Sequence, residues 1–235
     1  MIVDIDCGNS RIKWRIAGVG TCGDCSWADF ERAGVAALRL PVGPPERIRV
    51  ASVAGATQRL ALALTEAFGI EVERAQVLAG WDGLECGYHS PDRLGVDRWL
   101  AALAARRRWP NRPLVVVDAG TALTVDVLRA DRFEGGFIGP GMHMMRASLF
   151  SGTAAVKVPE LLDATPDAPA RDTGAAVSGA TYLMSIGLVG EVVARYAPDA
   201  EVVVTGGDGR RLAAALSGAH WVPHLVMDGL AVALP

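Results

Sequence analysis

The chain has few cysteines, no excess of positive charge and no long uninterrupted apolar run. Its 235 residues include four cysteines and carry a formal net charge of −3 at pH 7. Without a basic excess, no nucleic-acid-binding surface is expected. A membrane-spanning helix needs about 18 to 20 apolar residues, and we expect no such span. The N-terminus enters an apolar strand without a basic leader, which predicts a cytoplasmic protein.

The sparse cysteines and histidines also argue against a metal or redox centre built from them. Cys22 and Cys25 have the C-x-x-C spacing, but a structural zinc site takes about four ligands and no second pair exists. A thioredoxin-like motif joins a strand to a helix, whereas this pair is expected between two antiparallel strands. We interpret the cysteines as free thiols in turns, which suits a reducing compartment.

The most informative pattern in the chain is a short one that occurs twice. Residues 3–16 read VDIDCGNSRIKWRI, and residues 115–128 read VVVDAGTALTVDVL. A shift of 112 positions aligns Asp6 with Asp118 and Gly8 with Gly120. Each copy predicts a strand, a tight turn headed by a carboxylate, in which glycine takes a positive φ, and a returning strand. The repeat divides the chain into two halves.

Apolar periodicity predicts strands followed by helices in both halves. This order predicts an α/β fold of two duplicated lobes, residues 1–113 and 114–235, with a cleft between them. Residues 158–171 hold prolines and aspartates that predict an irregular loop. The expected strands are 2–6, 12–17, 25–28, 48–52, 72–77, 114–118, 124–128, 133–138 and 201–205, and the expected helices are 57–68, 95–108, 142–150, 173–196, 208–217 and 225–234.

The first turn carries groups that suit a phosphate. Gly8 lets backbone N–H groups approach an anion, Ser10 offers a hydroxyl, and Lys13 places a cation on the returning strand. Asp6 can hold a hydrated Mg²⁺, which takes few protein ligands. An ordinary hairpin turn contains the same residue types, and for one turn alone that reading is favoured. Two matching turns favour a ligand.

The second turn differs, because it holds no cation of its own. Asp118 ends a buried apolar strand, and a buried carboxylate needs a metal, a partner or a hydrogen-bond shell. Thr121 can donate a hydrogen bond to a phosphate oxygen. Gly206-Gly207 opens a later helix whose N-terminus can receive an anion. A tight turn with Asp208 as the N-cap explains that spacing equally well.

Residues 88–98 (YHSPDRLGVDR) gather ionisable side chains at the start of a helix. Asp97 is a candidate base next to a hydroxyl substrate. Arg93 or Arg98 can bind a substrate carboxylate through a two-pronged guanidinium. A capping and salt-bridge cluster explains the same pattern, and spacing alone does not separate the two. Four glycines in Gly135–Gly141 indicate close approach of a backbone or a ligand.

Taken together, these motifs resemble type III pantothenate kinases of the acetate kinase/sugar kinase/actin-like superfamily. The resemblance spans nearly the whole chain, and its motifs occur in order. They are D-x-G-N-S/T-x-x-K at Asp6–Lys13, Tyr88 followed by P-x-x-L-G-x-D-R at Pro91–Arg98, D-x-G-T-A at Asp118–Ala122, G-G-x-I-x-P-G at Gly135–Gly141, and D-T-x-x-A-x-x-S-G at Asp172–Gly179.

The resemblance implies actin-like (ribonuclease H-like) lobes with a nucleotide cleft between them, and ATP-dependent phosphorylation of pantothenate to 4′-phosphopantothenate, the first step of coenzyme A synthesis. It also implies a homodimer, Mg²⁺ and a monovalent cation, K⁺ or NH₄⁺. Asp97 would be the catalytic base, Asp118 would bind the monovalent cation, and Thr173 would reach pantothenate across the dimer interface. The residues implied for ATP are Asp6, Cys7, Gly8, Asn9, Ser10, Arg11, Ile12, Lys13 and Thr121, with Asp6 a candidate for Mg²⁺, and those for pantothenate are Tyr88, Gly95, Val96, Asp97, Arg98 and Thr173.

Two other functions are compatible with such a scaffold. Some relatives are described as accessory factors for transcription, and a regulator of that kind need not keep Asp6, Lys13, Asp97, Asp118 and Thr121 together. A phosphatase acting on a phosphoanhydride would need a residue that positions water. The cluster at residues 88–98 favours a bound acid substrate instead.

Overall fold

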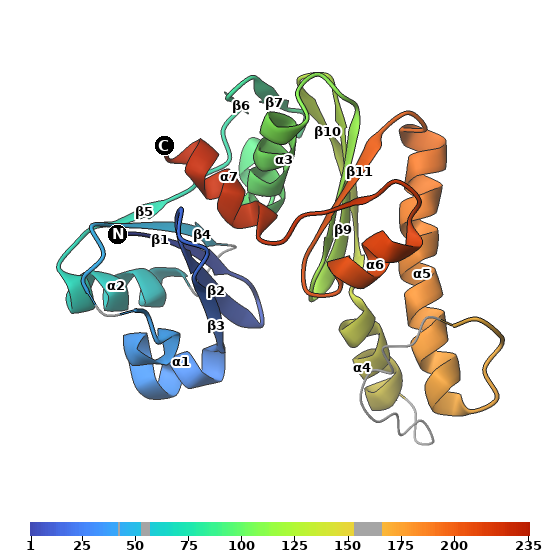
Figure 1. Cartoon of the computed structure of the whole chain (residues 1–235), viewed down its shortest axis with the longest axis horizontal. Helices are drawn as coiled ribbons and strands as arrows, with labels where there is room; N and C mark the ends of the chain where they lie inside the picture. Colours follow the sequence, from blue (N-terminus) through green and yellow to red (C-terminus); the bar gives the residue numbers. More distant parts are fainter. Residues whose placement is uncertain (42, 53–56, 153–165) are drawn as a thin grey trace. The chain divides into compact units, whose positions relative to one another are not determined.

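The structure is a computed structural model of the chain that describes residues 1–41, 43–52, 57–152 and 166–235 (Figure 1). The chain divides into two compact units: the first combines Met1–Pro110 with His224–Pro235, and the second is Asn111–Pro223. Part of the expected irregular loop, residues 158–165, lies outside the described residues. Residues 166–171 form no helix or strand.

The first unit is built on a five-stranded sheet in the order β3-β2-β1-β4-β5. Strands β1, β2 and β3 pair antiparallel, and β4 and β5 continue from β1 in parallel. A short hairpin follows β5 in the sequence. The strands are β1 Ile2–Cys7, β2 Arg11–Ile16, β3 Cys22–Ser26, β4 Arg47–Ser52 and β5 Val72–Arg74, and the hairpin is β6 Gly80–Trp81 with β7 Leu84–Cys86.

The sheet of the second unit repeats this topology. The strands that belong to the second unit run in the order β10-β9-β8-β11-β12, with β8, β9 and β10 antiparallel and β11 and β12 parallel to β8. Both halves therefore have the same strand order and the same strand directions, and the predicted duplicated actin-like fold is confirmed. The strands are β8 Leu114–Ala119, β9 Ala122–Arg129, β10 Arg132–Pro140, β11 Glu201–Thr205 and β12 His220–Trp221.

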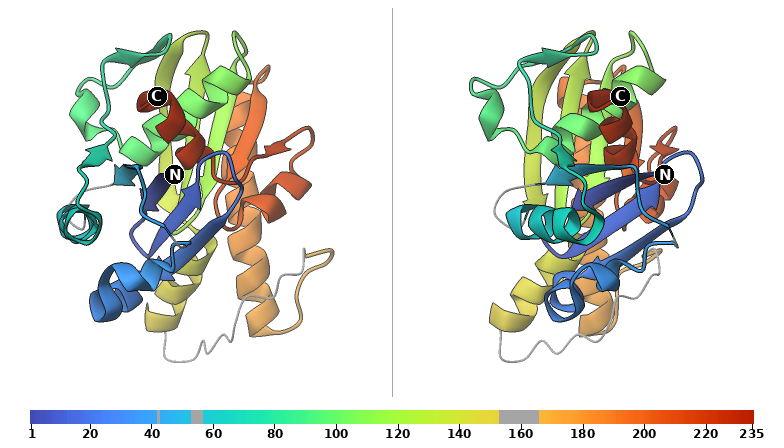
Figure 2. Two further views of the ribbon diagram at one scale, coloured as in Figure 1. Left: turned by 60° about the vertical axis from the view of Figure 1, so that its left-hand side comes forward. Right: turned by 90° about the vertical axis from the view of Figure 1, so that its left-hand side faces the viewer.

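Helices cover the sheets within each unit. In the first unit α1 and α2 lie over one face of the sheet, and α3 and α7 lie over the other (Figures 1 and 2). In the second unit α4, α5 and α6 contribute to one apolar core with β8, β9 and β11. The helices are α1 Trp27–Ala33, α2 Thr57–Phe68, α3 Val96–Arg108, α4 Met142–Gly152, α5 Thr173–Tyr196, α6 Gly209–Ala215 and α7 Leu225–Ala233, with short 3-10 turns at Gly34–Leu38 and Pro91–Arg93.

The alternation of side chains along β1 separates an apolar face from a polar one. Val3, Ile5 and Cys7 enter the core under α1 and α2. Asp4 and Asp6 point to the opposite face, because successive strand residues alternate. The polar face of β1 therefore carries the carboxylates that the repeat singled out.

The C-terminal helix belongs to the first unit by packing, although the sequence assigned it to the second lobe. Helix α7 lies against α3 so closely that a Cβ on Gly229 would be 2.1 Å from the carbonyl oxygen of Leu100. Its Asp228 side chain also pairs with Arg15 of β2. The compact units thus differ from the predicted lobes in residues 111–113 and 224–235, and the predicted lobes themselves stay a prediction.

One predicted strand has the wrong end, and one helix bears on the expectation of no membrane span. The strand expected at 25–28 ends at Ser26, because the Ser26 side chain accepts a hydrogen bond from Asp29 N at 3.1 Å and starts α1 at Trp27. Helix α5 is also long and apolar enough to cross a membrane, with a window of mean hydropathy 1.5. The prediction counted uninterrupted apolar runs, whereas α5 mixes apolar residues with glycine, serine and threonine. Seven of its side chains are buried in the second unit, and a core helix passes the same test.

Candidate active site

The first turn places Asp6 and Lys13 side by side. They are directly opposite in the β1–β2 pair, so their side chains share one face of the sheet. The turn closes with a hydrogen bond from Gly8 N to Arg11 O of 3.1 Å, and Asn9 and Ser10 are exposed at its tip. The turn thus presents a carboxylate, a cation and exposed backbone to the same region.

Glycine in the two turns is not needed for a positive φ, and that prediction is wrong. The described glycines with positive φ do not include Gly8 or Gly120. Gly8 is instead confined by close packing, since a Cβ there would lie 3.3 Å from the carbonyl oxygen of Arg11. The absence of a side chain lets the turn close tightly.

Two members of the predicted ATP-binding segment face away from the turn. Cys7 and Ile12 are buried in the apolar core of the first unit, so they can reach a ligand only through their backbone. Burial raises the pKa of the Cys7 thiol, and the charges of Asp6 and Cys25 raise it further, so the thiol stays protonated. Cys22 and Cys25 both lie on β3 three positions apart, which puts their side chains on opposite faces.

The two hairpins of the repeat differ by one residue in register. Asp6 lies opposite Lys13, whereas Asp118 lies opposite Thr124, one position earlier in the aligned repeat. A one-residue shift moves a side chain to the other face of a sheet. The longer first turn therefore brings Lys13 opposite Asp6, whereas in the second hairpin Thr124 lies opposite Asp118.

The Tyr88–Arg98 cluster is organised by the first turn of α3. The Asp97 Oδ1 atom accepts a hydrogen bond from Arg98 N at 2.8 Å, and the helix N-terminus favours this negative charge. The absence of a side chain at Gly95 makes space for the Asp97 carboxylate, because a Cβ there would lie 2.5 Å from Asp97 Oδ1. Arg98 is buried, donates from Nη1 to the Tyr88 hydroxyl at 2.7 Å, and lies over the Tyr88 ring. Val96 is also buried, so only its backbone is available to a substrate.

In the second unit the glycine-rich segments converge on the Asp118 turn. Gly206, with φ of 92°, approaches so closely that a Cβ would lie 2.4 Å from Asp118 Oδ1. Gly141 N donates to Thr121 O at 3.0 Å, and a Cβ on Gly141 would overlap the carbonyl oxygen of Gly120. The structure therefore brings together Asp118, Thr121 and two motifs that the sequence left open, because only glycine fits beside the turn.

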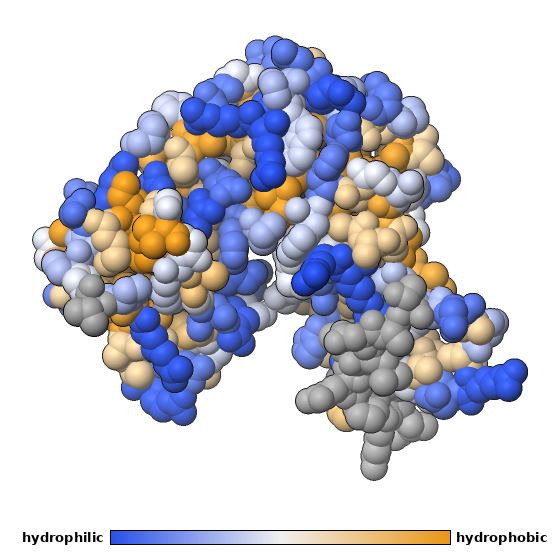
Figure 3. All heavy atoms as spheres, in the orientation of Figure 1, coloured by the Kyte–Doolittle hydropathy of each residue, from blue (hydrophilic) through white to orange (hydrophobic). Residues whose placement is uncertain are grey.

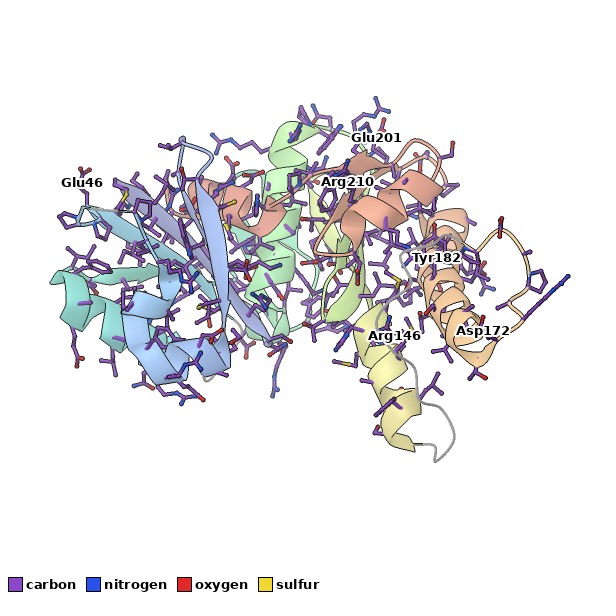
Figure 4. All side chains as sticks on the ribbon, turned by 60° about the horizontal axis from the view of Figure 1, so that its bottom comes forward. Glu46, Arg146, Asp172, Tyr182, Glu201 and Arg210 are labelled. Atoms are coloured by element: carbon purple, nitrogen blue, oxygen red, sulfur yellow. The ribbon has the colours of Figure 1, made fainter. Side chains whose placement is uncertain are left out.

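Thr173 lies at the first position of α5 and is exposed. The preceding residue, Asp172, caps the helix by accepting a hydrogen bond from Ala175 N at 2.8 Å (Figure 4). The D-T pair of the last motif is therefore a helix start. Asp208 takes the N-cap position of α6, but its side chain makes no capping hydrogen bond.

Sequence reasoning missed two residues near these turns. Trp27 Nε1 donates to the carbonyl oxygen of Gly8 at 2.8 Å, a contact over 19 positions that no local pattern reveals. Arg146 of α4 (Figure 4) is buried, and its Nε and Nη1 atoms have no hydrogen-bond partner in the described part of the chain. A buried guanidinium with unsatisfied donors suits an anion, and its α4 begins next to Gly141.

Comparison with known proteins identifies the family. The sequence profile of type III pantothenate kinase matches residues 2–195. A protein of Azoarcus sp. (strain BH72) named type III pantothenate kinase is 40% identical, over 99% of this chain and 90% of its own length. One of Ectopseudomonas mendocina with the same name is 37% identical, over 100% of this chain and 99% of its own length.

Solved structures support the fold at lower sequence identity. A Campylobacter jejuni protein described as a candidate Baf family transcriptional activator superposes with a TM-score of 0.67 at 19% identity, over 97% of this chain and 95% of its own. A candidate 2-dehydro-3-deoxygalactonokinase of Sinorhizobium meliloti gives 0.56 at 14% identity, over 99% and 98%. At these identities the likeness shows the fold alone.

Proposed function

The chain belongs to the type III pantothenate kinase family, and we propose that the two turns and the start of α3 carry out its reaction. That reaction is the ATP-dependent phosphorylation of pantothenate to 4′-phosphopantothenate, in coenzyme A biosynthesis. The observation that carries this assignment is the family match, which runs through both hairpins and the α3 cluster. Phosphoryl transfer needs mainly positioning and charge neutralisation, and the chain offers groups for both.

The first turn is proposed to bind the ATP phosphates. Lys13 supplies a positive charge and Ser10 a hydroxyl, and Asn9 adds an exposed backbone N–H at the tip of the turn. Asp6 is half-buried beside Lys13, and one carboxylate suffices for an ion that keeps most of its waters. Mg²⁺ held there would neutralise phosphate charge.

Asp97 is proposed to accept the proton of the pantothenate hydroxyl as that oxygen attacks the γ-phosphorus and ADP leaves. Its Oδ1 atom is held by Arg98 N, which fixes the direction of the carboxylate. The Arg98 guanidinium and the Tyr88 hydroxyl, already hydrogen-bonded to each other, are proposed to bind the substrate with the backbone of Gly95 and Val96. A guanidinium suits the carboxylate of pantothenate.

Asp118 is proposed to bind a monovalent cation, and Thr121 to contact ATP. The fit to a cation rests on two oxygens that lie together beside Gly206, Asp118 Oδ1 and the carbonyl oxygen of Ala119, which are 2.4 Å and 2.5 Å from the point where a Cβ on Gly206 would sit. A carboxylate and neighbouring backbone carbonyls are ligands that a hard cation prefers. K⁺ or NH₄⁺ would supply positive charge at a turn that has no lysine. Among the described residues no group of three or more histidine, cysteine, aspartate or glutamate side chains is placed to hold a metal ion.

A homodimer is proposed from the exposed face of α5. The Phe137 ring of β10 contacts the Tyr196 ring at the end of α5, with 5.4 Å between the ring centres, so the apolar surface is continuous between the two elements. In the region of α5, Figure 3 shows orange and tan residues interspersed with blue ones. Such a patch on a folded chain marks an interaction site, and a partner that covers α5 along its length would come near Thr173 at the start of the helix. The exposed apolar side chains of α5 and its neighbour on β10 are Phe137, Leu183, Met184 and Tyr196.

The dimer proposal is tested by Leu183→Glu, which puts a charge on the exposed face of α5 without touching the core. Analytical ultracentrifugation should show a dimer for the wild-type chain and a monomer for the variant. A wild-type monomer at micromolar concentration would contradict the proposal. We place the enzyme in the cytoplasm with its pathway, acting on pantothenate and ATP without a nucleic-acid or membrane partner.

The catalytic assignment is tested with purified protein, ATP, Mg²⁺, K⁺ and pantothenate, with mass spectrometry of 4′-phosphopantothenate. Asp97→Asn should lower kcat by a factor of about 100 or more, the size of a general-base contribution, while the KM for ATP changes little. Turnover near the wild-type value in that variant would remove Asp97 from the mechanism. The alternative of a non-catalytic transcriptional factor is not favoured, because its support is a structural likeness at 19% identity.

A further inference from the structure

The turn between β1 and β2 is held from outside by one aromatic side chain. Trp27 is the first residue of α1, and its indole N–H reaches the carbonyl oxygen of Gly8 at 2.8 Å. The Trp27 side chain is half-buried, so water competes only partly for this hydrogen bond.

Trp27 is itself fixed in place. Ser26 caps α1 and its hydroxyl lies 2.6 Å from Asp29 Oδ2. The Trp27 ring meets the buried Phe30 ring edge to face, at 5.9 Å and 84°, and packs against the core of the first unit. The indole is therefore a rigid donor rather than a mobile surface group.

A second contact of the same segment holds the other end of the turn. Ser26 lies opposite Arg11 in the β2–β3 pair, and the Arg11 guanidinium pairs with Asp24. The segment from Asp24 to Trp27 thus contacts both ends of the turn, by a hydrogen bond to Gly8 and an ion pair with Arg11.

The hydrogen bond to Gly8 fixes the direction of the next N–H group. In a trans peptide the carbonyl of one residue and the N–H of the next point in opposite directions, and the described chain has no cis peptide bonds. With the Gly8 carbonyl turned toward Trp27, the Asn9 N–H is turned away from it. The Gly8 N–H is already used inside the turn, and in the described part of the chain Asn9 N–H has no partner. It is therefore a donor left available for a ligand.

We propose that Trp27 is a positioning residue for the triphosphate: it locks the Gly8–Asn9 peptide so that the Asn9 N–H faces the ATP phosphates. The proposal rests on the proposed phosphate-binding role of the turn. A locked donor binds an anion without the entropic cost of ordering it, so the contribution of Trp27 appears only with ligands that carry phosphates.

Trp27→Phe in the full chain tests this, because it keeps the ring and removes the N–H. The KM for ATP and the Kd for ADP should rise about three- to tenfold, the value of one such hydrogen bond. The KM for pantothenate and the Kd for adenosine, measured by calorimetry, should stay within about twofold. Trp27→His restores a ring N–H at the equivalent position, since imidazole Nε2 corresponds to indole Nε1, and should recover most of the ADP affinity.

Trp81→Phe is the matched control. Trp81 Nε1 donates to the carbonyl oxygen of Val232 at 3.0 Å, so the same change removes the same kind of hydrogen bond away from the turn, and nucleotide affinity should not change. Equal losses for adenosine and ADP in Trp27→Phe, or no loss in a variant with wild-type circular dichroism, would overturn the role of Trp27. Lys13→Met tests the proposed phosphate-binding role of the turn separately from the role of Trp27. If Lys13→Met leaves ADP affinity intact, the phosphate-binding role is refuted, and the role of Trp27 is refuted with it.

Discussion

Replacing Asp4 by asparagine should be one of the most destabilising single changes in the first unit. Asp4 is fully buried on the polar face of β1. Its Oδ1 accepts a hydrogen bond from Arg49 Nε at 2.7 Å and its Oδ2 from Arg15 Nε at 3.1 Å. Arg49 also donates to the carbonyl oxygen of Leu234 at 2.8 Å, and Arg15 pairs with Asp228. One buried carboxylate is therefore the shared partner of two guanidinium groups that hold the C-terminal segment on the sheet.

The magnitude follows from burial of the charges that remain. Removing one partner of a buried ion pair costs about 3–5 kcal/mol, because the other charge stays buried without compensation. Asparagine keeps the volume and one acceptor oxygen, so we expect about 3 kcal/mol. For a chain of 235 residues each kcal/mol lowers the Tm by about 2–4 °C, so the midpoint should fall by roughly 6–12 °C.

Urea and thermal unfolding followed by circular dichroism measure this change. Glu46→Gln is the control, since Glu46 forms an exposed pair with the N-terminal amine at 2.9 Å (Figure 4) and should leave the urea midpoint unchanged. A loss below about 1 kcal/mol in Asp4→Asn would show that Arg15 and Arg49 find other compensation. That result would refute the reasoning from burial.

Two further predictions concern helix α7. Burial lowers the pKa of His224 below its ordinary 6.5, so the unfolded chain binds the proton more readily, and the free energy of unfolding should fall as pH drops from about 7.5 to 5.5. His224→Asn, which tolerates the left-handed φ of 60°, should reduce this pH dependence. Urea titrations at about pH 7.5 and 5.5 measure it, and the same difference in the variant as in the wild type would contradict the prediction. Gly229→Ala should lower the free energy of unfolding by about 3 kcal/mol, the upper end for overpacking, because the added Cβ would overlap the Leu100 carbonyl. A urea midpoint within error of the wild-type value would disprove the close packing of α3 and α7.

Much of the fold could be predicted because its signals are local. The bounds of α2, α5 and β11 agree with the predicted ones, since apolar periodicity and the terminal glycine or capping residue are all within the segment. The repeat of Asp6 and Asp118 predicted the duplication that the two matching sheets confirm. The prediction of a strand at 25–28 was wrong because it followed the apolar residues and did not recognise Ser26 as the N-cap of α1.

The candidate site was predicted in its residues but not in their surroundings. The sequence indicated Asp97, Arg98 and Tyr88 together, and the structure joins them through hydrogen bonds. It could not indicate that Gly206 packs on Asp118, because 88 positions separate them and only the β8–β11 pairing brings them together. The roles proposed for these residues stay predictions until the variants are measured.

By itself the sequence determined the duplicated α/β architecture, the carboxylate at the head of each hairpin and the family. Each of these depends on strand periodicity, turn residues or motifs that lie within short segments of the chain. Only the tertiary structure decided the register that puts Lys13 beside Asp6, the contact of Trp27 with Gly8 and the packing of α7 on the first unit. Those features depend on which strands pair and which faces are buried. They follow from the free energy of packing the whole unit, which no short segment encodes.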